Sequence, residues 1–223
     1  MLAERRIASE IMDDPALPAD SYAAVLNDLA AANRLTLARR PTLAFLDRAL
    51  AGRSSFSLLD VGFGHGDMLR AIAHWAARRN VQARLYGIDL NPRSADIARA
   101  ATAPALPITF DTGDYQALGG HGYDVIVSSL VTHHMSEAQI IAFLRFMEDE
   151  ARVGWFVNDL HRHTFSYLAY PLLARLMRWH PIVRHDGQTS IARSFRPRDW
   201  ERLLAAAGIG AARIEPAFPF RLC

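Results

Sequence analysis

Apolar and polar residues follow two different rhythms along this chain. Compact apolar runs recur at intervals, as expected for strands that are buried on both faces of a parallel sheet. Between these runs, apolar residues return every three or four positions, which is typical of helices with one buried face. The alternation predicts an α/β fold with a doubly wound, mainly parallel sheet and helices on both faces.

The same pattern places the individual elements. Asn91-Pro92 and Ser136 are expected to cap helices, and Asp20 or Ser21 to cap an earlier one. Residues 212–223 are expected to add one or two short final strands. The remaining strands are expected at residues 58–60, 83–90, 107–110, 123–128 and 154–159, with helices at residues 67–79, from 92, from 136 and at 197–207.

Glycines alternate at positions 62, 64 and 66, directly after the strand that ends at Asp60. Glycine lets a backbone turn sharply and approach a ligand closely. A strand, a glycine turn and a helix N-terminus predict a nucleotide-sized pocket at the carboxyl edge of the sheet, although a tight turn without a ligand would use the same residues. The spacing departs from the dinucleotide fingerprint G-x-G-x-x-G, because the third glycine arrives one residue early and Asp67 follows it.

Acidic residues follow the next two strands. Asp89 ends the second strand, where an acid can accept both ribose hydroxyls of a nucleoside. Capping of the next helix is the alternative role, but Asn91 already fills it. Asp114 follows the third strand, in a stretch that would equally suit an ordinary polar turn.

Two adjacent histidines, His133 and His134, lie in the loop after the fourth strand, at the edge of the sheet where ligands bind. A histidine side chain titrates near neutral pH and can take the proton of a phenol. Packing or loop hydrogen bonding is the alternative for either residue. We expect one of the two to act, with a slight preference for His134, and His161 after the fifth strand as the reserve base.

The composition narrows the possible classes. The chain has 223 residues, of which 51% are hydrophobic, and this predicts one domain with a large core. A net charge of +2 gives no dominant surface for polyanions. All 25 basic residues are Arg, which excludes lysine chemistry, and the single Cys223 excludes a disulfide framework, a cysteine-rich metal site and an internal cysteine nucleophile.

The N-terminus lacks the apolar core of a secretory signal, and no stretch of about 20 residues is apolar enough to cross a bilayer. We therefore expect a cytoplasmic enzyme. Within its single domain, we expect a helical lid at 1–52, a cofactor-binding core at 55–160, an insertion over the substrate at 161–193, and a final helix with strands at 194–223.

The Asp-x-Gly-x-Gly-x-Gly turn, Asp89, Asp114 and the fourth strand with its loop together resemble class I S-adenosylmethionine-dependent methyltransferases, over roughly residues 55 to 223. The resemblance implies a Rossmann-like, seven-stranded sheet with S-adenosyl-L-methionine as cofactor, Asp89 on its ribose and Asp114 on its adenine. Arg34, in the N-terminal segment, could reach a carboxylate of the ligand and is a further candidate contact. The expected cofactor contacts are Asp60, Gly62, Phe63, Gly64, Gly66, Asp89, Leu90, Asp114, Tyr115, Ser128, Ser129 and Arg34.

The loop Leu130-Val131-Thr132-His133-His134-Met135 resembles the small-molecule branch of this family, which includes ubiquinone-biosynthesis and natural-product enzymes. Three further segments are similar to bacterial members that sit with polyketide pathways: Met12-Asp13-Asp14-Pro15, Asn158-Asp159-Leu160 and Arg184-His185-Asp186-Gly187. The resemblance implies O-methylation of a phenolic or enolic molecule. One departure is Arg152-Val153-Gly154, where many methyltransferases have Pro-Gly-Gly.

The apolar, aromatic segment 161–193 suits a flat apolar acceptor better than a phosphate backbone. A buried helix pair without ligand contact is the alternative. The acceptor contacts are expected among Phe165, Tyr167, Leu168, Tyr170 and Leu172.

Nucleic-acid methylation is a competing function class. Enzymes that methylate base amino groups carry Asn/Asp-Pro-Pro-aromatic where this chain has Ser128-Ser129-Leu130-Val131, and no RNA-binding module is visible. We therefore expect no nucleic-acid partner, no metal, and a monomer or homodimer acting on a small aromatic molecule. A cyclase, or a relative that binds the cofactor without methyl transfer, stays open as the alternative.

Overall fold

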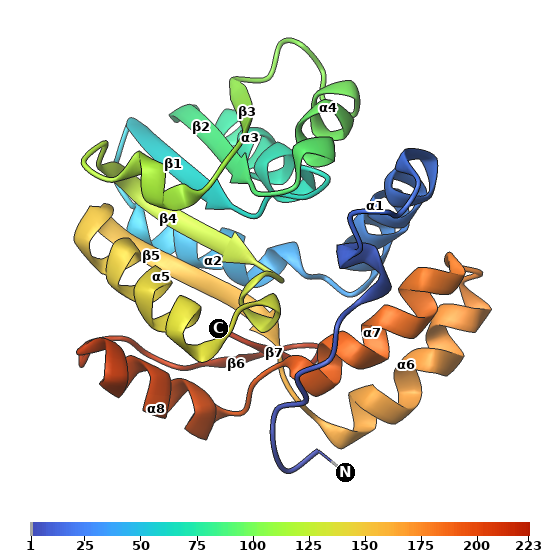
Figure 1. Cartoon of the computed structure of the whole chain (residues 1–223). Coiled ribbons are helices and arrows are strands. Elements are labelled where there is room, and N and C mark those ends of the chain that lie inside the picture. The colour runs from blue at the N-terminus through green and yellow to red at the C-terminus, as the bar shows by residue number, and fades with distance from the viewer. Residues whose placement is uncertain (1) are drawn as a thin grey trace.

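The computed structural model describes residues 2–223, which form a seven-stranded sheet of order β3-β2-β1-β4-β5-β7-β6 (Figure 1). The first five strands pair in parallel, whereas β7 is antiparallel to both β5 and β6. The strands are β1 (Ser55–Val61), β2 (Gln82–Asp89), β3 (Ile108–Thr112), β4 (Tyr123–Ser129), β5 (Ala151–Leu160), β6 (Pro216–Ala217) and β7 (Arg221–Leu222). The predicted fold, a mainly parallel seven-stranded sheet, is confirmed.

Helices cover both faces of this sheet. The helices are α1 (Ala19–Leu35), α2 (Arg39–Ala49), α3 (Asp67–Arg78), α4 (Pro92–Ala100), α5 (Glu137–Glu150), α6 (Thr164–Leu176), α7 (Pro181–Arg193) and α8 (Pro197–Ala207), with 3-10 turns η1 (Ile11–Asp13), η2 (Tyr115–Leu118) and η3 (Thr132–His134). One hydrophobic core joins β1 and β2 to α2, α3 and α4. A second core on the other face joins β4 and β5 to α5 and α8.

Most predicted helix starts are observed. Asn91 accepts a hydrogen bond from the amide of Arg93, and Ser136 and Gln139 form a reciprocal capping box. The prediction that Asp20 or Ser21 caps the first helix is wrong, because α1 begins at Ala19 after Pro18 and has no side-chain cap. Asp20 instead lies in the first turn, where a negative charge is stabilised by the helix dipole.

A third apolar cluster lies outside the sheet and joins α1, α6 and α7 through Val25, Ala174, Trp179 and Val183. Figure 1 shows these three helices grouped beyond the ends of the strands toward which β4 points. The segment predicted to cover the substrate, 161–193, therefore takes the form of two helices. Together with α1 it faces the carboxyl edge of the sheet, where the predicted site residues lie.

The segment before α1 is fastened across this helical group. The carboxylate of Asp186 in α7 accepts hydrogen bonds from the backbone amides of Ile11 and Met12, at 3.0 and 2.9 Å. The buried guanidinium of Arg162 donates to the carbonyl oxygens of Leu2 and Ser194. These contacts fix η1 and the residue before it, Glu10, over the carboxyl edge of the sheet.

None of the helices formed by residues 2–223 has both the length and the apolar character that a membrane crossing requires.

Candidate active site

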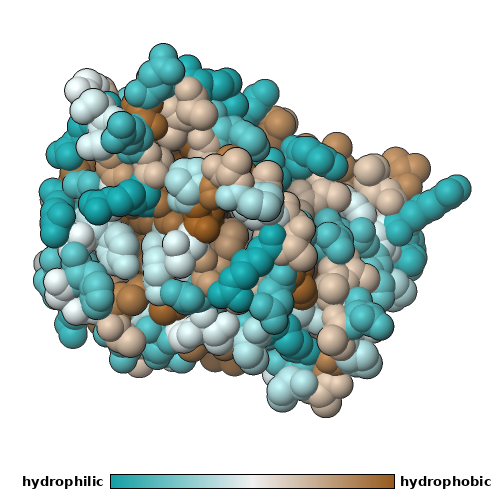
Figure 2. Space-filling model, turned by 90° about the horizontal axis from the view of Figure 1, so that it is seen from above, coloured by the Kyte–Doolittle hydropathy of each residue, from teal (hydrophilic) through white to brown (hydrophobic). Residues whose placement is uncertain are grey.

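A cavity of about 720 Å³ lies at the carboxyl edge of the sheet, between the strand ends and the cover formed by α1, α6 and α7. Apolar side chains from α1 and α6, among them Val25, Leu29 and Leu173, line one part of it. The glycine turn after β1, the end of β2 and the loop after β4 line the rest. Seen from above in Figure 2, hydrophobic side chains show in the hollow between polar groups. The size suits a small-molecule site with room for more than one ligand.

Within the glycine turn, different positions lack a side chain for different reasons. Gly62 has a φ of +75°, and a Cβ there would collide with the side chain of Val131. Gly64 has a φ of +51°, and the nearest atom to a Cβ there would be 3.8 Å away on Leu26. Gly62 is therefore required by packing, whereas Gly64 leaves open backbone at the cavity wall. Gly66 packs against the ring of Phe110 and does not line the cavity.

Asp60, at the end of β1, is buried, and both of its carboxylate oxygens are without a hydrogen-bond partner among residues 2–223. Burial, together with the charges of Asp67 and Asp89, raises the pKa of Asp60 to about 8. The Oγ atom of Ser129, at the end of β4, is also buried and unpartnered in that part of the chain. Both residues line the cavity, so the fold holds an unsatisfied acid and an unsatisfied hydroxyl at its wall.

Asp89 ends β2 with its carboxylate fixed by two backbone amides. Oδ2 accepts from Gly64 at 2.8 Å, and Oδ1 accepts from Asn91 at 2.8 Å. Burial nevertheless raises the pKa of Asp89, and the two amide hydrogen bonds oppose this. The acid is thus tied to the glycine turn and lines the cavity beside it.

The other expected cofactor residues divide into two groups. Phe63, Leu90 and Tyr115 line the cavity. Asp114 is exposed and caps η2 by accepting from the amide of Gln116, and Ser128 donates to the carbonyl of Val61 beneath the cavity wall. Neither Asp114 nor Ser128 lines the cavity.

The expected basic residue is placed differently from the prediction. Arg34 lies in the last turn of α1, is exposed and does not line the cavity. Arg39, at the start of α2, lines it instead and forms an ion pair with Asp67 at 3.0 Å. Arg221 in β7 also lines it, with Nε and Nη1 buried and without partners among residues 2–223. The sequence offered no sign of Arg221, because β7 is only two residues long.

The histidine pair is the centre of a polar cluster. Nδ1 of His133 lies 2.7 Å from Oδ1 of Asp159, and both side chains are buried. Burial alone would raise the pKa of Asp159, but the charge of His133 and the hydrogen bonds from His133 and Thr132 lower it to about 2. Asp159 is therefore a carboxylate that can only accept, so Nδ1 of His133 carries a proton, and in the neutral ring Nε2 is the nitrogen with the free lone pair.

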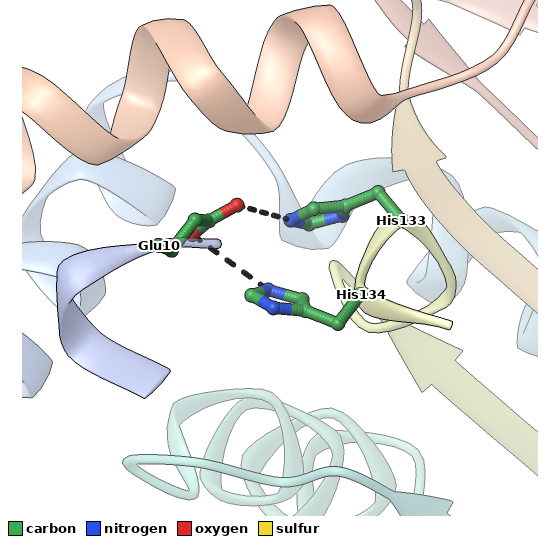
Figure 3. A group of neighbouring side chains, drawn as sticks. All are labelled: Glu10, His133 and His134. Carbon is green, nitrogen blue, oxygen red and sulfur yellow. Dashed lines mark ion pairs between the residues drawn. The ribbon is translucent and has the colours of Figure 1, made fainter. Parts of the chain in front are cut away.

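His134 has a matching arrangement on a different acid. Its Nδ1 atom lies 3.0 Å from Oδ2 of Asp13 in η1. Figure 3 shows that both imidazole rings turn a nitrogen toward Glu10, which comes from the N-terminal segment. Nε2 of His133 is 3.8 Å from Oε1 of Glu10, and Nε2 of His134 is 3.9 Å from Oε2. Both rings thus face the same carboxyl group, which the sequence analysis did not identify.

Glu10 is buried, and desolvation raises its pKa to about 7. Its Oε1 atom accepts from Ser190 at 2.9 Å, and the guanidinium of Arg193 lies 3.6 Å from the same oxygen. The donor atoms of Glu10, His133 and His134 lie within 4.8 Å of one another, a spacing from which metal ligands can close. The guanidinium of Arg193 already supplies a positive charge beside this carboxyl group, which disfavours a second cation.

His161, the expected reserve base, lines the cavity, and burial lowers its pKa. It lies next to His163, with ring centroids 5.7 Å apart. No carboxylate orients its ring in the described chain, in contrast to His133 and His134.

The expected acceptor residues fall on two faces of α6. Phe165 and Tyr170 line the cavity together with Ser166, Ala169 and Leu173, which the sequence analysis did not select. Tyr167, Leu168 and Leu172 do not line it, and Leu168 and Leu172 point outward, 66% and 73% exposed. Ser166, Ala169, Tyr170 and Leu173 are three or four positions apart and share a face, whereas Phe165 lines the cavity although its side chain is 62% exposed.

Comparison with known proteins agrees with this geometry. Residues 58–153 match the family model described as a methyltransferase domain. The match covers less than half of the chain. The matched segment contains the glycine turn, Asp89 and the histidine pair, whereas Glu10, Asp13 and Asp159 lie outside it. The predicted resemblance to class I methyltransferases is confirmed.

Several solved structures share the fold of this chain over most of its length. A SAM dependent methyltransferase from Aquifex aeolicus is 16% identical, with 90% of this chain and 95% of that chain covered and a TM-score of 0.61. Magnesium protoporphyrin IX methyltransferase from Synechocystis PCC 6803, with bound SAH, is 20% identical over 84% of this chain and 80% of that chain, with a TM-score of 0.58. Human N-acetylserotonin methyltransferase, in complex with SAM, is 14% identical over 88% and 53%, with a TM-score of 0.59. At these identities the likeness shows the fold alone. No curated protein sequence matches the chain.

Proposed function

We propose that this protein is an S-adenosylmethionine-dependent methyltransferase that methylates a hydroxyl group of a small, largely apolar molecule. One observation carries the proposal. The glycine turn and Asp89, which suit a nucleoside, line the same cavity as His133, whose ring is oriented by the buried carboxylate of Asp159. A nucleoside site and an oriented base in one cavity are what methyl transfer to a hydroxyl group requires.

The residues of the cavity fit the cofactor. The open backbone at Gly64 allows close approach, and Asp89 is fixed where it can accept the ribose hydroxyls. The unpartnered carboxyl group of Asp60 suits the positive charge of the methionine part. When bound, S-adenosylmethionine supplies a methyl group on a positively charged sulfur, which keeps the bonding electron pair when the methyl group passes to the acceptor oxygen.

His133 is the general base in this proposal. Its Nε2 lone pair takes the hydroxyl proton, and Asp159 holds the ring in the required tautomer and stabilises the charge that the ring acquires. The proton leaves the oxygen as the new carbon–oxygen bond forms, so the product is a neutral ether. His134 has an exposed partner in Asp13 and takes the second place, which reverses the slight preference drawn from the sequence.

The character of the cover supports a small apolar acceptor. Side chains of α1, α6 and α7 such as Leu173 and Val183 close the cavity, which disfavours a charged phosphate backbone. We propose no nucleic-acid partner for this site.

Methyl-labelled S-adenosylmethionine tests the proposal. The intact protein is incubated with the labelled cofactor and a set of apolar phenols, and the ether product is identified by mass spectrometry. We expect label in at least one phenol and none in RNA. Tight cofactor binding without transfer to any hydroxyl group would instead favour a cyclase or another non-methylating relative.

A further inference from the structure

The hydrogen bonds of the histidine pair fix both tautomers. Nδ1 of His133 donates to Asp159, and Nδ1 of His134 donates to Asp13. In the neutral rings the Nε2 atoms are therefore the acceptors, and both are directed toward Glu10 (Figure 3). Proton removal from one hydroxyl group needs only one such nitrogen, so the second nitrogen requires its own explanation.

Glu10 adds a carboxyl group to the same space. The separations of 3.8 Å and 3.9 Å between its oxygens and the two Nε2 atoms exceed a hydrogen bond. A hydroxyl group in either gap can donate its one proton to the imidazole nitrogen, and its oxygen can accept from Glu10 when that carboxyl group is protonated, which a pKa of about 7 allows. Because the two oxygens of Glu10 share one carbon, the two gaps are adjacent, as are two hydroxyl groups on neighbouring carbons.

The charges around Glu10 indicate a neutral ligand. Arg193 lies 3.6 Å from Oε1 of Glu10 and 3.5 Å from Oδ2 of Asp13, and Ser190 donates to Glu10 from the same helix, α7. One guanidinium thus already offsets part of the negative charge of Glu10 and Asp13. An ammonium group or a metal ion would be repelled by Arg193, whereas hydroxyl groups would not.

We infer that the acceptor carries two hydroxyl groups on adjacent carbons, as in a catechol or an ene-diol. This inference rests on the proposed function and names the acceptor class of the same site. One hydroxyl group lies between His133 and Glu10 and is methylated as His133 takes its proton. The other lies between His134 and Glu10 and holds the ring in register, so His134 and Glu10 determine specificity. The product retains one hydroxyl group, and a second methylation is disfavoured because the new ether has no proton to donate.

A comparison of three simple acceptors tests the inference. The kcat/KM of the intact enzyme is measured with 1,2-dihydroxynaphthalene, 1,3-dihydroxynaphthalene and 1-naphthol at saturating S-adenosylmethionine. We expect the 1,2-diol to be preferred by at least about tenfold, because a site built for a hydroxyl group leaves its polar atoms unpaired when that group is missing. We also expect the mono-ether as the main product.

Variants separate a specific role from a structural one. His134→Gln should lower the ratio of kcat/KM for the 1,2-diol to kcat/KM for 1-naphthol by about tenfold. Glu10→Gln should lower the same ratio. The matched control is His74→Gln, a change at an exposed position of α3, and it should leave the preference as in the parent. Melting temperatures and binding of S-adenosylhomocysteine confirm that each variant is folded.

The outcomes are distinguishable. Equal methylation of all three acceptors would overturn the inference and leave the proposed function in place. If both Glu10→Gln and His134→Gln keep the preference for the 1,2-diol, the inference is also overturned, because other residues would then recognise the diol. If none of the acceptors is methylated or bound while the cofactor binds, the proposed function and the inference are both wrong.

Discussion

The imidazole of His133 donates a 2.7 Å hydrogen bond from Nδ1 to the buried carboxylate of Asp159 at the end of β5. The backbone amide of His133 donates to the other oxygen of the same carboxylate. The loop after β4 is thus fixed to the neighbouring strand by one acid. This arrangement leaves Nε2 as the only atom of the ring that can accept a proton.

His133→Gln should lower kcat by about 10²-fold or more, because a positioned base contributes at least this much to proton transfer. Binding of S-adenosylhomocysteine should be retained, since no hydrogen bond or ion pair within residues 2–223 joins His133 to the glycine turn or to Asp89. Steady-state kinetics and calorimetry on the same preparation measure both quantities. His74→Gln is the control, and an unchanged kcat in His133→Gln would place the base elsewhere.

Phe165→Ala should raise the KM for the acceptor several-fold and leave cofactor affinity as in the parent. Phe165 lines the cavity from α6, whereas Leu168, one turn further on, points outward. Leu168→Ala is therefore the matched control from the same helix, and its KM should stay close to that of the parent. A larger effect at Leu168 than at Phe165 would mean that the acceptor lies on the outer face of α6.

Asp60 should make the cofactor-free protein less stable as pH rises. Burial raises the pKa of Asp60 from 3.8 to about 8, so between these values the folded state holds a proton that the unfolded state has released. The free energy of unfolding should then fall by up to about 1.4 kcal/mol per pH unit within this window. Urea unfolding at pH 5 and pH 8 measures the difference.

Asp60→Asn removes this ionisable group, so its stability should decrease less between pH 5 and pH 8 than that of the parent. The control is Asp96→Asn, because the side chain of Asp96 is 87% exposed. Equal pH dependence in the parent and in Asp60→Asn would mean that Asp60 is ionised in the folded protein. Asp60→Asn should also bind S-adenosylmethionine more weakly, since the carboxyl group of Asp60 can ionise beside the positive charge of the methionine part and an amide cannot.

Removal of metal ions should leave both the rate and the melting temperature unchanged. Glu10, His133 and His134 are close enough to suggest a metal site, but Arg193 places a guanidinium 3.6 Å from Glu10. The assay is repeated after exhaustive dialysis against EDTA, with and without added zinc or manganese. A loss of activity that either metal restores would show that the cluster binds a cation and that His133 is a ligand rather than a base.

Much of the fold could be predicted because it depends on local sequence. Backbone rules that act over a few residues are enough to interpret the apolar run before Asp60, the glycines after it and the acid at position 89. The side chains of α6 that line the cavity were predicted less well. Leu168 and Leu172 are apolar and lie on the exposed face of α6, whereas Ser166 and Ala169 line the cavity, so hydrophobicity alone selected the wrong face.

The residues that complete the histidine cluster could not be predicted from the sequence. Glu10 and Asp13 reach the histidines from more than a hundred positions away, on a segment with no periodic pattern. Their position is set by Asp186 of α7, which holds the backbone of Ile11 and Met12. Such long-range contacts leave no local signal. Asp159 could have been identified from the sequence, because an acid at the end of the fifth strand lies at the same edge of the sheet as the histidine loop.

Titration of the intact protein with S-adenosylhomocysteine in a calorimeter tests the central claim most directly. We expect one site per chain, no comparable heat from NAD, and at least about tenfold weaker binding by Asp89→Ala, because a half-buried acceptor fixed by the amides of Gly64 and Asn91 is lost. Asp96→Ala, at an exposed acid in α4, should bind as the parent does. Absence of binding by the intact protein, or equal binding by Asp89→Ala, would contradict the assignment of this cavity to S-adenosylmethionine.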